Sequence, residues 1–230
     1  MKLFIFHGDN QTQSRQALIS QLENLKRNQI QLKWLDGLQI TKPDLEIELT
    51  TQNLFQTEAI IIENLLTRPR SQTKTQCLKL LNNYHGSKDV YLWDKKTVSQ
   101  TTLKQLQNQK PIVNLFKFPS YLFKFLDSFQ PHNQTQALKL FHQTLTLTNE
   151  QLIFVMLTRR LAQLIQAKTA PDLLNGPNWQ KQQLIRQSQT WNLNRLLSTY
   201  RQLIKIDYSI KTGQTQLDLV TQLDLLILGL

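Results

Sequence analysis

The chain has little of several features that mark common protein classes. It holds a single cysteine, Cys77, so no disulfide can form within it, and a reducing compartment is expected. Cys77 lies in a helical pattern, which predicts a buried structural thiol. No apolar run is long enough to span a membrane, and the opening run MKLFIFHGD is too short for a signal peptide. We therefore expect a cytoplasmic protein.

Motifs for metal binding and covalent catalysis are also missing. The histidines are scattered without the spacing of metal ligands, so we expect no metal site. They are His7, His85, His132 and His142. No GxSxG motif and no cysteine–histidine pair can be nominated as a nucleophile. We expect no catalytic residue in this chain.

Acidic residues are scarce: 16 Asp and Glu stand against 27 Lys and Arg, a net charge of +11. Such a balance favours a polyanionic partner, most often nucleic acid, through release of counterions from phosphates. A solvated basic surface is the alternative. With 40% hydrophobic and 19% charged residues, the composition is that of a soluble globular protein.

Short apolar runs alternate with amphipathic stretches over residues 1–118. The spacing predicts strands at 3–7, 30–35, 59–62, 90–93 and 112–116. It predicts helices at 12–28, 44–50, 74–83 and 101–108, with Asp44, which follows Pro43, as a cap. Strands and helices in alternation indicate a parallel, three-layer α/β sheet whose strands are buried on both faces.

From Ser120 onward the strand period is lost. We expect residues 119–132 to be a linker, or the remnant of a middle domain with a short helix at 121–129. Residues 133–230 then predict an all-helical domain of about five helices. Its last two helices are separated at Gly213, where a left-handed cap is needed.

The turn after the first strand is where an ATPase of this architecture holds phosphates. A working P-loop reads GxxxxGK[ST]. Residues 7–15 have one glycine, Gly8, no lysine, and an aspartate, Asp9, that would repel phosphate. Glu63 follows the third strand without a paired acid, which is more typical of a turn or helix cap. We expect no ATP hydrolysis and no cofactor.

Two basic clusters are candidates for contact with DNA phosphates. One follows the third strand and the other lies in the helical half. They comprise Arg68, Arg70 and Lys74, and Arg159 and Arg160. The alternative is a polar loop and an exposed helix face.

Short sequence motifs along nearly the whole chain resemble those of one protein family. They are LFIFHGDN at residues 3–10, Asp36–Gly37, Leu54–Phe55 before the strand AIII, residues 90–94 and 119–126, the helix at 152–164, and Asp207 followed by Lys211-Thr212-Gly213 and a leucine-rich end. Together they resemble the delta subunit of the DNA polymerase III clamp loader, in a form shortened between the sheet and the C-terminal helices.

The resemblance implies a degenerate AAA+/RecA-like sheet domain without a Walker A motif, followed by a helical collar-type bundle that joins other loader subunits. It implies a subunit that binds and opens the sliding clamp for loading on primed DNA, without ATPase activity of its own. Such a chain belongs to a DNA-directed DNA polymerase (nucleotidyltransferase) holoenzyme. In the family, adjacent Leu and Phe side chains enter a hydrophobic pocket on the clamp, and these match Leu54 and Phe55.

Three alternatives stand beside this interpretation. The chain could be a diverged AAA+-like NTPase that still binds nucleotide, or a stand-alone basic DNA-binding protein. Leu54 and Phe55 could also pack into the core of their own domain.

Overall fold

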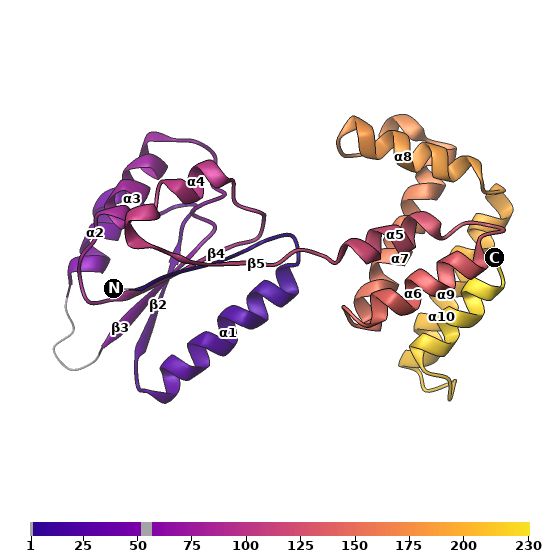
Figure 1. The fold of residues 1–230 in the computed structure, drawn as a ribbon, viewed down its shortest axis with the longest axis horizontal. Coiled ribbons are helices and arrows are strands. Elements are labelled where there is room, and N and C mark those ends of the chain that lie inside the picture. Colours follow the sequence, from indigo (N-terminus) through magenta and orange to yellow (C-terminus); the bar gives the residue numbers. More distant parts are fainter. Residues whose placement is uncertain (1, 52–56) are drawn as a thin grey trace. The chain divides into compact units, whose positions relative to one another are not determined.

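The computed structural model describes residues 2–51 and 57–230. These fall into two compact units, Met1–Phe118 and Pro119–Leu230 (Figure 1). The first unit is a parallel sheet with helices and the second is entirely helical. The expected fold class, an α/β domain followed by a helical bundle, is confirmed.

The sheet has five strands in the order β2-β3-β4-β1-β5, and every neighbouring pair is parallel. The strands are β1 (Leu3–His7), β2 (Gln31–Asp36), β3 (Glu58–Glu63), β4 (Asp89–Asp94) and β5 (Ile112–Leu115). In register, Phe4 of β1 lies opposite Tyr91 of β4 and Ile112 of β5. The carboxyl ends of the strands therefore meet at one edge, where ligands bind in open parallel sheets.

Helices connect the strands, as parallel pairing requires. They are α1 (Gln11–Arg27), α2 (Lys42–Thr50), α3 (Gln72–Asn82), α4 (Gln100–Lys104) and the 3-10 turn η1 (Gln107–Gln109). Helix α1 covers one face of the sheet, and α2, α3 and α4 cover the other (Figure 1). Two hydrophobic clusters fill these interfaces.

Strand β3 shows how the sequence builds both cores. Ile60 and Ile62 face the cluster under α2 and α3, while Ala59 and Ile61 face the cluster under α1. All four are buried because β3 lies inside the sheet. The prediction of burial on both faces is wrong for the edge strands: Trp34 of β2 is exposed, and most of β5 is exposed as well.

Helix α2 begins at Lys42, two residues earlier than the sequence pattern predicted. Its N-cap is Thr41, whose hydroxyl accepts from the Asp44 N–H, while the Asp44 carboxylate accepts from the Thr41 N–H. This is a capping box, with Pro43 in the first turn. Asp44 therefore stabilises the helix start from its third position and is not the cap itself.

The helical unit consists of six α-helices and one 3-10 turn. They are α5 (Ser120–Ser128), α6 (Gln134–Leu145), α7 (Glu150–Thr169), η2 (Pro171–Leu173), α8 (Asn178–Gln189), α9 (Leu193–Lys211) and α10 (Leu219–Leu228). Helix α7 packs against α8 and α9, and α10 packs against α6, α7 and α9.

Aromatic residues from α5 form part of the core of this unit. Phe125 lies 5.4 Å from Phe141 of α6, centroid to centroid, and 6.0 Å from Phe129. Phe129 in turn stacks on Trp191 at 6.0 Å. Interpreting residues 119–132 as a linker is therefore wrong, because the apolar face of α5 is buried in the bundle.

Gly213 ends helix α9 in the left-handed conformation that the sequence predicts, with φ of 67°. The Gln214 N–H donates to the Ser209 carbonyl at 2.9 Å, and the Gly213 N–H donates to the Ile210 carbonyl at 3.3 Å. These two bonds make a Schellman motif.

Candidate functional site

The turn after β1 is closed by the chain's own backbone. Gly8 has φ of 139°, and a Cβ placed on it would lie 1.9 Å from the carbonyl oxygen of Phe116. The Phe116 N–H donates to the His7 carbonyl at 2.8 Å, and the Asn10 N–H donates to the Phe116 carbonyl at 3.2 Å. In a phosphate-binding loop such amides point at the ligand. Here the Asn10 amide donates instead to the segment that follows β5.

The start of α1 is likewise satisfied internally. The Asn10 side chain accepts from the Gln13 N–H at 3.2 Å, and the Asn10 carbonyl accepts from the Ser14 N–H at 3.0 Å. A helix N-terminus binds anions through free amides and its dipole. Because these amides already have partners, this helix start offers little to a phosphate.

Arg15 occupies the place of the magnesium ligand of a P-loop. If Gly8 is aligned with the first glycine of GxxxxGK[ST], Ser14 takes the position of the lysine and Arg15 that of the final hydroxyl. The Arg15 guanidinium forms an ion pair with Glu63 at the end of β3. A cation at this position would repel Mg²⁺ and already neutralises the acid that would bind it.

Two tryptophans hold Arg15 in place. Its guanidinium lies 5.0 Å from the ring centroid of Trp34 and 4.6 Å from that of Trp93. The Trp93 indole N–H donates to the buried hydroxyl of Ser14 at 3.2 Å. Cation–π contacts and the ion pair therefore fix Arg15 over the ends of β2, β3 and β4.

His7 is buried at the end of β1. Its Nδ1 accepts from the Val98 N–H at 3.1 Å. Burial lowers the pKa of His7; the charge of Asp9 opposes this shift and that of Lys117 adds to it. His7 is therefore a neutral side chain that anchors the segment after β4, and not a base directed at a substrate.

Buried charges also fix the loop between β3 and α3. The Asp94 carboxylate accepts from the Leu66 N–H (3.3 Å) and from the Thr67 N–H (2.7 Å) and hydroxyl (2.6 Å). Burial raises the pKa of Asp94, and these hydrogen bonds oppose the rise. The Lys74 ammonium donates to the carbonyls of Leu66 and Arg68 at 2.6 and 2.7 Å. The prediction that Lys74 contacts DNA directly is therefore corrected, because its ammonium is buried and hydrogen-bonded to the backbone.

Arg160 needs the same correction. Its guanidinium is mostly buried in the helical unit, 3.0 Å from both the Asp127 carboxylate and the Gln187 side-chain oxygen. Arg68 donates to the carbonyls of Gly37 and Ile40 at 3.3 and 3.0 Å. These two cations hold helices and loops together.

Arg70 and Arg159 are exposed, so for them a contact with DNA phosphate stays a prediction. They lie in different units of the chain. The prediction for Leu54 and Phe55 also stays open, because both lie outside the described residues.

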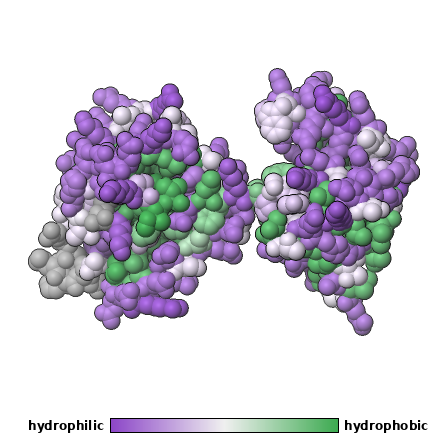
Figure 2. All heavy atoms as spheres, in the orientation of Figure 1, coloured by the Kyte–Doolittle hydropathy of each residue, from purple (hydrophilic) through white to green (hydrophobic). Residues whose placement is uncertain are grey.

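The helical unit has an apolar groove between α7 and α9, with a volume of about 430 Å³. Its walls carry Phe154, Val155, Tyr200, Leu203 and Ile204, with Arg159 and Asp207 among the lining residues. On α10, Leu225 and Leu228 are exposed while the opposite face of the helix is buried. Apolar side chains are visible over α10 in Figure 2. Such surfaces are typical of protein contacts.

Sequence reasoning missed the Arg15–Glu63 pair and the position of Lys96. The P-loop frame counted from Gly8 would have placed Arg15 at the metal-binding position. Lys96 follows β4 as Arg70 follows β3, and the carboxyl ends of adjacent parallel strands share an edge. That rule would have placed both cations on the same side.

Residues 2–51 and 57–230 contain no helix with the length and apolarity needed to cross a membrane. In the same residues, no three His, Cys, Asp or Glu side chains gather as metal ligands.

No family model matches the chain, and no curated protein matches it in sequence. Solved structures do match, and one of them is the Bacillus subtilis DNA clamp loader delta protein YqeN. The two chains are 11% identical with a TM-score of 0.49, over 100% of this chain and 95% of that one. Function must therefore be inferred from this chain's own residues.

Proposed function

We propose that this chain is a delta-type subunit of the DNA polymerase III clamp loader, which binds and opens the sliding clamp without hydrolysing ATP. The observation that carries the proposal is the closed nucleotide position. Gly8 packs on Phe116, Asn10 caps α1, and Arg15 neutralises Glu63. An ATPase-like sheet whose nucleotide position is filled by its own residues suits a protein that acts by contact.

In this proposal the two units have separate partners. The sheet unit binds the sliding clamp through Leu54 and Phe55, the pair that matches the family's clamp-binding residues. The helical unit joins other loader subunits, which is supported by the groove between α7 and α9 and by the exposed leucines of α10. The chain contacts primed DNA in the assembled loader, and its net charge of +11 suits binding to the phosphates of that DNA.

Titration of the full chain with the sliding clamp of its own organism tests this function. Changing Leu54 and Phe55 together to Ala should weaken clamp binding by about 2 kcal/mol or more, roughly thirtyfold, as expected of an interface hot spot. Unfolding stability should stay within about 0.5 kcal/mol, as for surface changes.

A matched control removes two exposed apolar side chains elsewhere in the sheet unit, Ile19→Ala with Leu38→Ala. This variant should bind the clamp as the unchanged chain does. The proposal fails if no clamp binding is detected, or if the Leu54 and Phe55 changes cost several kcal/mol of stability and leave binding per folded molecule unchanged.

A further inference from the structure

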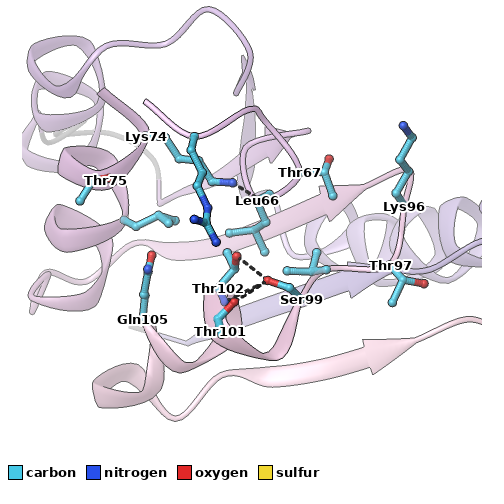
Figure 3. Close-up of a pocket in the computed structure, with 13 residues that line it drawn as sticks. Leu66, Thr67, Lys74, Thr75, Lys96, Thr97, Ser99, Thr101, Thr102 and Gln105 are labelled. Atoms are coloured by element: carbon cyan, nitrogen blue, oxygen red, sulfur yellow. Dashed lines mark hydrogen bonds between the residues drawn. The ribbon is translucent and has the colours of Figure 1, made fainter. Parts of the chain in front are cut away.

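A second pocket lies at the carboxyl ends of β3 and β4, on the face of the sheet opposite α1. It is between the start of α3 and α4 and has a volume of about 650 Å³ (Figure 3). One wall is the loop and first turn after β3, and the other is the segment after β4 with α4. A volume of this size suits a ligand as large as a nucleotide.

The charge of this pocket is positive. Arg70, Lys74 and Lys96 line it, and no Asp or Glu is among its described lining residues. Two carboxylates, those of Asp94 and Asp9, are hydrogen-bonded to lining residues. They accept from the hydroxyls of Thr67 and Thr97 at 2.6 and 3.3 Å. The pocket therefore has an excess of positive charge.

Two of the three cations are free to bind a ligand. Within the described parts of the chain, Arg70 and Lys96 have no hydrogen-bond or ion-pair partner, and both are exposed. Lys74 is held by the carbonyls of Leu66 and Arg68 and contributes its charge from there, whereas the side chain of Lys96 extends away from Lys74 (Figure 3). Burial lowers the pKa of Lys74 and the neighbouring Arg70 lowers it further, whereas Asp94 raises it. An anion in the pocket would favour the charged ammonium.

Hydroxyl groups complete the lining. The Ser99 hydroxyl lies 2.9 Å from those of Thr101 and Thr102, so these groups share hydrogen bonds with one another (Figure 3). A hydroxyl can turn its proton toward a new acceptor. Arginine with lysine and hydroxyls is a donor set that suits phosphate, which offers several acceptor oxygens and up to two charges.

We propose that this pocket binds a phosphate group, contacted by Arg70 and Lys96. The phosphate could be carried by a nucleic-acid strand or by a small phosphorylated compound, and the chemistry of the site is the same for both. The inference does not depend on clamp binding, because the chain alone would bind the anion.

The test uses the full chain without any partner. Binding of a fluorescein-labelled single-stranded oligo-dT is measured by anisotropy at low and physiological ionic strength, and binding of inorganic pyrophosphate by calorimetry. The variant Arg70→Gln with Lys96→Gln should lose about tenfold or more in affinity for the anion that binds. It should fold normally, since neither side chain has a partner to lose in the part of the chain that the structure describes.

The matched control is Lys95→Gln with Lys104→Gln, which removes the same charge from exposed positions on the neighbouring segments but outside the pocket lining. The affinity of this control for the same anion should stay within about twofold of that of the unchanged chain, because exposed charges outside the pocket are screened by salt. Oligonucleotide binding that pyrophosphate displaces would identify a nucleic-acid phosphate, and pyrophosphate binding alone would identify a small compound. Equal losses in the two double variants, or no binding of either probe at low salt, would overturn the proposal.

Discussion

The carbonyl oxygen of Phe116 lies where a Cβ on Gly8 would have to be, 1.9 Å from its ideal position. This contact joins the end of β1 to the segment that follows β5, at the turn where a P-loop would hold phosphate. Only glycine fits, because φ at this residue is 139° and the neighbouring atoms belong to backbone.

Gly8→Ala should therefore destabilise the sheet unit by roughly 2–5 kcal/mol, since backbone strain and overpacking add. Gly213→Ala is the comparison, because φ there is 67° but nothing lies within 4 Å of the added Cβ. That change should cost only about 1–2 kcal/mol. Urea unfolding followed by circular dichroism measures both. Similar losses in the two variants would mean that the contact with Phe116 is unimportant.

His7 should make the sheet unit sensitive to mild acid. Its pKa in the folded chain is lowered below the ordinary 6.5, so the unfolded chain binds a proton first as pH falls. The stability that the neutral His7 side chain contributes is therefore fully present above about pH 6.5. It declines as the pH drops below that value, by up to about 1.4 kcal/mol per pH unit. His7→Asn keeps an acceptor for the Val98 N–H and should flatten this decline. His85→Asn, at an exposed position, should leave the decline as it is.

The chain alone should not hydrolyse ATP, because Arg15 neutralises Glu63 and its positive charge would repel Mg²⁺. Phosphate release should equal the rate without protein. Any thermal stabilisation by ATP should be the same with and without Mg²⁺, and should be lost in the Arg70→Gln, Lys96→Gln variant. A magnesium-dependent rise in melting temperature would show that the nucleotide position at β1 is open.

Gln187 should be a stabilising residue of the helical unit. Its side-chain amide donates to the Leu126 carbonyl at 2.7 Å, at the end of α5. Gln187→Ala leaves buried polar groups without a partner, which costs about 1–3 kcal/mol. Gln182→Ala, on the exposed side of α8, should change stability by less than about 0.5 kcal/mol. Chemical unfolding of both variants decides whether the bond matters.

The exposed leucines of α10 should be needed for assembly with loader subunits. Leu225→Ser with Leu228→Ser should keep the helical content, since both side chains are more than half exposed (56% and 57%). Association with the other subunits should weaken by at least about tenfold in analytical ultracentrifugation. Leu147→Ser with Leu173→Ser changes two other leucines of the same unit that are more than half exposed. If that pair weakens assembly as much, α10 has no special role.

The sequence by itself determined what depends on neighbours along the chain. A continuous apolar run placed β3, and apolar side chains at three- to four-residue steps placed α1, each within one residue of the observed bounds. The left-handed Gly213 and the absence of a P-loop lysine were likewise visible from residue type alone. These features follow from local backbone preference and spacing, which act over a few residues.

Tertiary structure decided which elements became neighbours. Arg15 and Glu63 are 48 residues apart and meet only because α1 passes over the end of β3. Lys74 and Arg160 read as exposed cations, but the fold buries them where carbonyls and Asp127 compensate the loss of water. Helix α5 belongs to the bundle because Phe125 packs against Phe141 of α6. Phe129, the residue after α5, stacks on Trp191. Burial and pairing of charge depend on contacts between distant segments, and local spacing does not encode them.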